Sequence, residues 1–96
     1  MAEVNIRVQP THNPNSLLFH VDRTVTEERM KQFNSAEDAA AVPLARALFE
    51  IENVTTIFFM PSSITVSKEP EGDWDVIAPA AEEAIQAHFA AKEPNP

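Results

Sequence analysis

The chain has 96 residues and contains no cysteine, which removes several kinds of chemistry at once. Without thiols there is no disulfide bond, no cysteine nucleophile, and no thiolate ligand for zinc or for an iron–sulfur cluster. A small domain without disulfides is typical of a reducing compartment, and the first residues lack the apolar core of a secretory signal. From these two features we expect a cytoplasmic protein.

Glycine is almost as rare as cysteine, because Gly72 is the only one in the chain. Glycine-rich phosphate-binding loops need several glycines, so that backbone N–H groups can approach the phosphate without a Cβ in the way. The sequence also lacks a run of about 20 apolar residues, the length that a membrane-spanning helix requires. Nucleotide binding by such a loop and a helical membrane span are therefore both excluded.

Positive charge is scarce as well, since 7 Lys and Arg stand against 15 Asp and Glu and give a net charge of −8. Such a chain repels phosphate backbones and anionic lipid headgroups, so we expect neither nucleic acid nor a membrane among its partners. Apolar residues make up 44% of the chain, enough for one modest hydrophobic core. We expect one domain over residues 1–96, with its core in residues 4–89 and a frayed tail at 92–96.

Alternation of apolar and polar residues predicts strands over residues 4–9, 17–21, 54–60 and 64–68, with a further short extended piece at 30–33. In the first strand Val4, Ile6 and Val8 are expected to face the core. Phe58 and Phe59 are adjacent in a strand, so their rings must point to opposite faces of the sheet. One of the two is then either exposed to a partner or covered by a neighbouring loop or helix end, and the sequence does not distinguish these outcomes.

Helical periodicity is visible in two segments. After a short capped turn opened by Ser35 and ending near Ala41, a helix is predicted over residues 43–49, and a second over 74–91 with Asp73 as its cap. The stripes expected to be buried are Leu44, Ala47, Leu48 and Ile51 in the first helix, and Trp74, Ile77, Ala78, Ala81, Ile85 and Phe89 in the second. The predicted fold class is α+β, in two layers: an antiparallel sheet of about four strands with two main helices on one face.

The loop of residues 11–16 is rich in hydrogen-bonding side chains and carries Pro14 between Asn13 and Asn15. A loop stiffened by proline loses little entropy on binding, so Asn13 and Asn15 are candidate partner-binding residues. The same residue types are also simply good turn formers. We expect Asn15→Ala to cost about 1 kcal/mol or less if only a turn bond is lost.

Catalytic and metal-binding constellations are weak. The serines lie near no recognisable His–acid pair, so we expect no enzyme. Residues three and four before His88 are not metal ligands, so the last helix offers no ligand pair, and His12 and His20 are only weak candidates for a metal site. A small ligand-binding or iron-binding domain that uses these two histidines is the alternative function.

One segment resembles a known family. Residues 10–19, Pro-Thr-His-Asn-Pro-Asn-Ser-Leu-Leu-Phe, resemble the Thr-Pro-Asn-Pro-Asn-Ala-Leu-Lys-Phe signature of the N-terminal domain of Nfu/NifU-type iron–sulfur scaffold proteins. The resemblance continues through residues 35–40, 43–45, 48–54, 58–61, 64–68 and 74–75, and covers roughly residues 4–89, nearly the whole chain. His12 and Met60 depart from it, standing where the family usually has proline and glycine.

The resemblance implies a role in iron–sulfur cluster assembly. In full-length members of the family a second domain carries the Cys-x-x-Cys pair that holds the cluster, and those residues are not in this chain. We therefore expect no directly bound cofactor, an iron–sulfur cluster reached only through partners, and a non-catalytic docking role. Expected partners are iron–sulfur assembly or client proteins, and the chain is expected to be a monomer or weak dimer. The candidate contacts are Asn13, Asn15, Phe19, Phe58 and Phe59.

Overall fold

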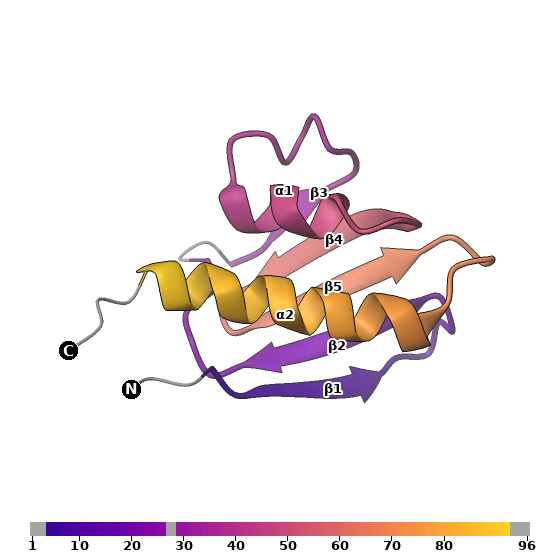
Figure 1. Cartoon of the computed structure of the whole chain (residues 1–96), viewed down its shortest axis with the longest axis horizontal. Helices are drawn as coiled ribbons and strands as arrows, with labels where there is room; N and C mark the ends of the chain where they lie inside the picture. Colours follow the sequence, from indigo (N-terminus) through magenta and orange to yellow (C-terminus); the bar gives the residue numbers. More distant parts are fainter. Residues whose placement is uncertain (1–3, 27–28, 93–96) are drawn as a thin grey trace.

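Five strands and two helices make up the computed structural model, which describes residues 4–26 and 29–92 (Figure 1). In chain order they are β1 (Ile6–Pro10), β2 (Ser16–Val21), β3 (Lys31–Phe33), α1 (Pro43–Phe49), β4 (Val54–Met60), β5 (Ser63–Lys68) and α2 (Trp74–Lys92). The predicted α+β class is confirmed. The sheet has five strands rather than about four, because the short extended piece near residue 31 pairs with β4 as a full edge strand.

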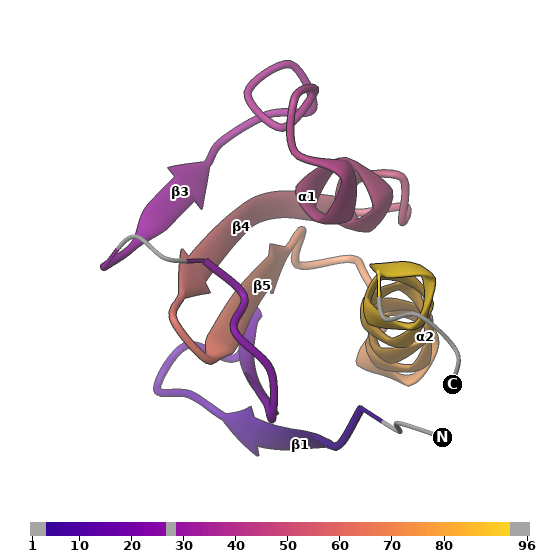
Figure 2. The same ribbon diagram turned by 90° about the vertical axis from the view of Figure 1, so that its left-hand side faces the viewer.

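The strands form one antiparallel sheet in the order β1-β2-β5-β4-β3. Both helices lie on the same side of it (Figure 2), as predicted. The covered face buries the rings of Phe19, Phe33 and Phe59 together with Ile64 and the stripes of the helices. Phe33 and Phe59 meet edge to face with their ring centroids 5.2 Å apart, a favoured aromatic geometry.

Helix α1 begins at Pro43, where a missing N–H costs nothing. Before it, the Ser35 hydroxyl accepts a hydrogen bond from the Asp38 N–H, and the segment forms the expected short turn. The buried residues of α1 are Leu44, Ala45 and Leu48. The predicted stripe was therefore wrong in part: Ala47 and Ile51 are only half-buried, because α1 rests on β4 and α2 along a face rotated from that stripe.

Helix α2 begins where predicted, because the Asp73 carboxylate accepts a hydrogen bond from the Asp75 N–H over 2.9 Å. Of the predicted stripe, Ile77, Ala81, Ile85 and Phe89 are buried. Trp74 and Ala78 are only half-buried, so the prediction was wrong for these two residues. The backbone of α2 continues to Lys92, and the rest of the predicted frayed tail lies outside the described residues. Within residues 4–26 and 29–92, no helix has both the length and the apolar character needed to cross a bilayer.

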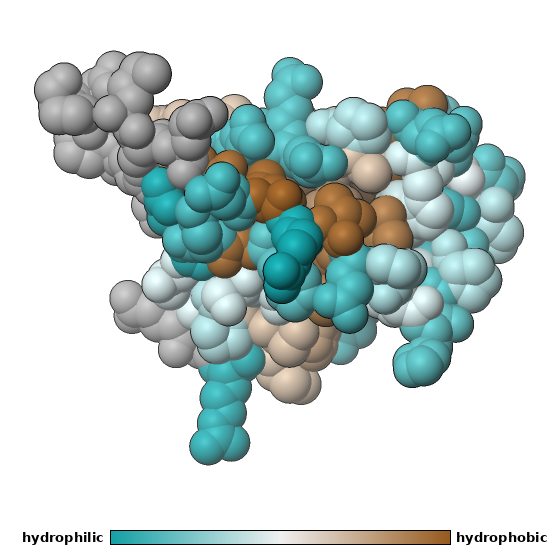
Figure 3. All heavy atoms as spheres, turned by 90° about the horizontal axis from the view of Figure 1, so that it is seen from below, coloured by the Kyte–Doolittle hydropathy of each residue, from teal (hydrophilic) through white to brown (hydrophobic). Residues whose placement is uncertain are grey.

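Strand β1 is an edge strand, and its apolar residues are less buried than the alternation of apolar and polar residues predicts. Val8 is paired with the fully buried Phe19 and so lies on the helix-covered side of the sheet, as predicted. It is nevertheless 36% exposed, because it belongs to the edge strand. Neither helix extends over the outer edge of the sheet. Seen from the β1 side, apolar surface gathers in the centre with hydrophilic side chains lying across it (Figure 3).

The edge position also explains why β1 can contain proline. The Asp22 N–H donates to the Asn5 carbonyl, and this bond continues the β1–β2 ladder. Because the bonding alternates along an antiparallel pair, the backbone polar groups of Ile6, Val8 and Pro10 point away from β2. The missing N–H of Pro10 therefore breaks no bond within the sheet.

Gly72 permits a close approach between two connections of the fold. A Cβ at this position would lie 3.0 Å from the Asn53 Cβ, 3.0 Å from the Ile77 Cδ1 and 3.2 Å from the Glu69 carbonyl oxygen. Asn53 itself has a positive φ of 74°, a conformation that asparagine tolerates better than most residues. These contacts, with the Glu69 N–H donating to the Asn53 carbonyl over 2.8 Å, join the loop before α2 to the turn before β4.

Candidate functional site

The 11–16 loop, comprising residues 11–16, is organised by its own side chains. The Asn13 N–H donates to the Thr11 hydroxyl oxygen over 3.0 Å, and the Asn15 N–H donates to the Asn13 side-chain oxygen over 2.9 Å. The Thr11 hydroxyl lies within hydrogen-bonding distance of the carbonyls of Asn13 and Ser16, at 2.9 and 3.1 Å. The Asn13 side-chain oxygen therefore accepts a hydrogen bond within the loop, as the turn interpretation requires.

Two residues distant in sequence fasten this loop to the rest of the molecule. The Trp74 indole N–H donates to the Pro14 carbonyl over 2.9 Å. The Lys68 ammonium donates to the Asn15 side-chain oxygen over 3.1 Å, while the Lys68 backbone N–H donates to the Asn15 carbonyl over 2.8 Å. The 11–16 loop is thus held against the end of β5 and the first residue of α2.

Lys68 is the buried cation of this junction, with 8% of its surface exposed. Its ammonium also lies 3.2 Å from the Glu69 carbonyl and 3.5 Å from the Pro70 carbonyl, and 5.6 Å from the centre of the Trp74 ring. Carbonyl oxygens and the face of an indole ring stabilise a positive charge that has left water. Sequence reasoning missed Lys68 and the contacts of Trp74, because residues 50 or more positions apart meet only in the folded chain.

The two adjacent phenylalanines separate as strand alternation demands. Phe59 is buried at 2% exposure, whereas Phe58 is half-buried on the side of the sheet away from the helices. Phe19 is entirely buried in the core, so its ring does not reach the surface. Of the three candidate aromatic contacts, the structure therefore leaves only Phe58 at the surface.

The face that carries Phe58 is called the open face. Cross-strand pairing aligns one row across all five strands of it: Gln9, Leu18, Thr65, Phe58 and Gln32. Leu18 and Phe58 make the middle of this row largely apolar, with Thr65 between them, and these three residues are half-buried. The two ends of the row are polar and exposed. An apolar centre with a polar rim is the anatomy of a transient protein interface.

The two candidate histidines lie near the β1 end of the open face. His12 is exposed and lines a shallow hollow with Gln9, Pro10, Thr11 and Leu18, and His20 shares a hydrogen bond of 2.9 Å with the Gln9 side chain through Nε2. Among the residues that the structure describes, no three His, Cys, Asp or Glu side chains converge as metal ligands would. The arrangement offers single imidazoles to a ligand and no preformed metal centre.

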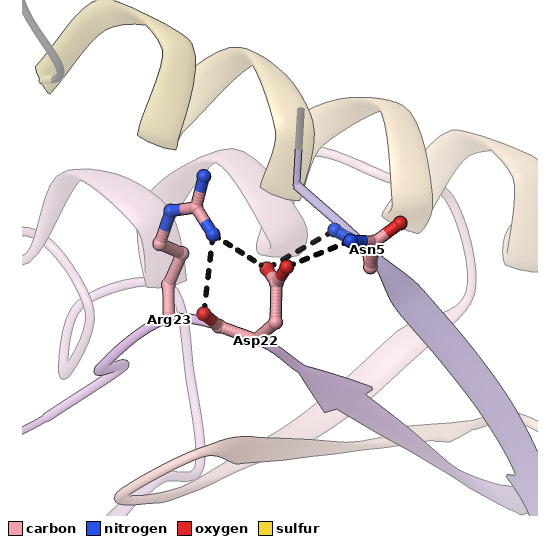
Figure 4. A network of polar contacts seen from close by, with 3 residues as sticks. All are labelled: Asn5, Asp22 and Arg23. Carbon is pink, nitrogen blue, oxygen red and sulfur yellow. Dashed lines mark hydrogen bonds and ion pairs between the residues drawn. The ribbon is translucent and has the colours of Figure 1, made fainter. Parts of the chain in front are cut away.

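Asp22 follows directly after β2 and forms a network of polar contacts with Asn5 and Arg23 (Figure 4). Its carboxylate accepts hydrogen bonds from the Asn5 side-chain amide over 2.9 Å and from the Asn5 backbone N–H over 3.1 Å, and pairs with Arg23 over 2.8 Å. The hydrogen bonds from Asn5, assisted by the nearby Arg23 guanidinium, lower the pKa of Asp22 below its ordinary value of 3.8. These contacts join the residue before β1 to the residue after β2.

Comparison with known families identifies one match, to the family "Scaffold protein Nfu/NifU N terminal" over residues 6–92. Among curated proteins, the chain is 44% identical over 86 residues to the human protein "NFU1 iron-sulfur cluster scaffold homolog, mitochondrial", covering 88% of the chain and 34% of that protein. It is 30% identical over 89 residues to "NifU-like protein 4, mitochondrial" of Arabidopsis thaliana, covering 93% of the chain and 31% of that protein. The chain thus spans about a third of the length of these relatives.

Solved structures share the fold. A NifU-like protein from Saccharomyces cerevisiae superposes with a TM-score of 0.79 at 18% identity, over 93% of this chain and 81% of that one. Protein SAV1430 from Staphylococcus aureus superposes with a TM-score of 0.75 at 20% identity, over 88% of this chain and 99% of that one. At these identities the likeness is evidence for the fold alone.

The printed names of the curated relatives correct one expectation. The human protein and the Arabidopsis relative are both named as mitochondrial, which overturns the prediction of a cytoplasmic protein. The prediction failed because its two premises, the absence of cysteine and of an apolar signal core, distinguish secreted chains from others. Neither premise distinguishes one compartment without disulfide formation from another.

Proposed function

The chain belongs to the family of Nfu/NifU N-terminal scaffold domains, and from this membership we propose that it serves iron–sulfur cluster assembly as a non-catalytic docking module. The observation that carries the proposal is the match of a chain without any cysteine to a scaffold family. Thiolates are the usual ligands of iron–sulfur clusters, so a chain without them contributes through recognition of the proteins that hold the cluster. The cluster is then the cargo of those proteins.

The surface proposed for this docking combines the open face with the adjoining 11–16 loop. Phe58 and Leu18 supply an apolar centre, and the exposed side of the loop supplies the amide of Asn13. Because Trp74 and Lys68 hold the loop in place, little conformational entropy is lost when a partner binds it. The occupant proposed for this surface is a protein or domain that carries an iron–sulfur cluster on a Cys-x-x-Cys pair.

The test uses a separately expressed Nfu-type Cys-x-x-Cys domain, loaded with its cluster under anaerobic conditions, as the probe. Addition of this domain to the isotope-labelled chain should shift backbone amides around Phe58 and Asn13. Phe58→Gln should weaken the complex about tenfold, since a half-buried aromatic contact is lost. The matched control is Val76→Gln, which removes an exposed apolar side chain from α2 on the opposite layer and should leave affinity unchanged.

Three outcomes would contradict the proposal. The first is an absence of shifts at saturating probe concentration. The second is equal weakening by the Phe58 and Val76 variants. The third is retention of cluster absorbance by the purified chain after anaerobic reconstitution and desalting, because the chain would then bind the cluster itself.

A further inference from the structure

A second surface lies between the two helices, on the opposite layer from the open face. Its floor is an apolar groove of about 330 Å³, and its rims carry one acid from each helical segment. The lining residues are Ala47, Glu50, Ile51, Ala80, Glu83, Ala84 and Ala87. This surface is called the helix groove.

Helix α2 carries apolar side chains beyond those that it buries against the sheet. Ile77, Ala81 and Ile85 are buried against the sheet, and the residue before each of them lies about 100° around the helix axis. Those preceding residues are also apolar: Val76, Ala80 and Ala84. Val76 is 65% exposed, the largest exposure of any large apolar side chain among the described residues.

Helix α1 and the residues after it also carry apolar side chains that are not fully buried in the core. The residues that it buries are Leu44, Ala45 and Leu48, whereas Ala47 and the following Ile51 are half-buried in the groove. Two helices therefore present apolar side chains to a space that no described element of the chain fills. Small side chains on the floor allow the backbone of a third helix to approach closely.

The charges of the rims indicate what kind of helix fits. Glu50 and Glu83 are both exposed, neither forms an ion pair with another described residue, and no basic side chain lines the groove. A second copy of the chain would bring another net charge of −8 to this surface and be repelled. A cationic partner gains attraction from the same charges.

We propose that the helix groove binds a basic amphipathic helix of a partner protein, with its apolar stripe on the alanine floor and lysine or arginine side chains on Glu50 and Glu83. This is helix-in-groove recognition, in which anchors at helical spacing give affinity and flanking charges give orientation. The groove and the open face lie on opposite sides of the sheet, so the domain can hold a basic helix while its open face docks another protein.

The probe is a synthetic helical peptide of about 14 residues, with leucines on one face and lysines on the flanks. Titrated into the labelled chain at about 0.15 M salt, it should shift the amides of the groove residues and leave those around Phe58 unmoved. Glu50→Lys and Glu83→Lys should each weaken binding several-fold, and the double variant by about tenfold or more. Glu71→Lys makes the same charge change on the exposed loop before α2 and is the matched control.

Several outcomes would overturn the proposal. They are no binding at millimolar peptide, shifts spread evenly over the acidic surface, or equal weakening by Glu71→Lys, which would mean non-specific charge attraction. Equal affinity for a peptide with glutamine in place of lysine would also contradict it. Because no cluster-bearing protein enters this experiment, its result is independent of the test proposed for the open face.

Discussion

The Lys68 ammonium donates a hydrogen bond to the Asn15 side-chain oxygen over 3.1 Å, and this contact joins positions that are 53 residues apart. It ties the loop that carries the family signature to the end of the central strand β5. The loop is therefore part of a larger junction, and its rigidity depends on residues outside it.

Asn15→Ala is expected to destabilise the fold by about 1.5–3 kcal/mol, because it removes an acceptor from a buried ammonium. This replaces the smaller loss expected from the sequence, which assumed that only a turn bond was at stake. Urea unfolding measures the difference. Asn13→Ala is the control and should cost about 1 kcal/mol or less, since its side chain accepts only an exposed backbone N–H. Equal losses for the two variants would contradict the role given to Lys68.

Trp74→Phe removes the hydrogen bond to the Pro14 carbonyl and keeps an aromatic ring near Lys68. The expected loss is about 0.5–1.5 kcal/mol, the usual net value of one neutral hydrogen bond. Amide spectra should show the largest changes in the 11–16 loop. If the loop amides stay unchanged while α2 is disturbed, the indole serves the helix and not the loop.

Gly72→Ala should destabilise by about 1–3 kcal/mol, because the new methyl group would lie 3.0 Å from both the Asn53 Cβ and the Ile77 Cδ1. Thermal unfolding of the variant checks this. Adding Asn53→Gly removes one of the two opposing atoms and suits the positive φ at that position, so the double variant should recover part of the loss. A double variant no more stable than Gly72→Ala would show that the clash with Asn53 is unimportant.

Asp22 should make stability depend on pH. Its pKa is lowered in the folded chain, so its contribution is present above the unfolded value near 3.8 and is lost as the pH falls through the folded pKa. Asp22→Asn should therefore be less stable than the parent chain near neutral pH, and the difference should shrink as the pH falls below 3.8 and through the folded pKa. Urea midpoints across this range measure the difference, with Glu71→Gln as an exposed control. A difference that grows as the pH is lowered below 3.8 would contradict this direction.

The same substitution should destabilise the fold much more at Phe59 than at Phe58. Phe59→Ala empties a core position beside Phe33 and should cost about 3–5 kcal/mol. Phe58→Ala removes a half-buried ring from the open face and should cost less than about 2 kcal/mol. Chemical unfolding of both variants measures this contrast. Similar losses would mean that the open face is packed as tightly as the core.

Local patterns in the sequence predicted most of the strands and helices, because the alternation of a strand or the periodicity of a helix depends only on residues within that element. The alternation around Phe58 and Phe59 predicted that their rings diverge, and the side chain of Asp73 was correctly assigned as the cap of α2. The family signature in residues 10–19 was also readable from the chain alone. These features depend on neighbours within a few positions of one another.

The tertiary structure decided which faces are covered. It left Val8 at an uncovered edge, buried Phe19 completely, and rotated α1 so that Ala47 and Ile51 line a groove. Lys68, a charged residue at the end of β5, is buried near the ring of Trp74 and donates a hydrogen bond to Asn15. Periodicity in the sequence shows which face of a strand or helix is apolar. Only the packing of elements that are distant in sequence determines what lies against that face.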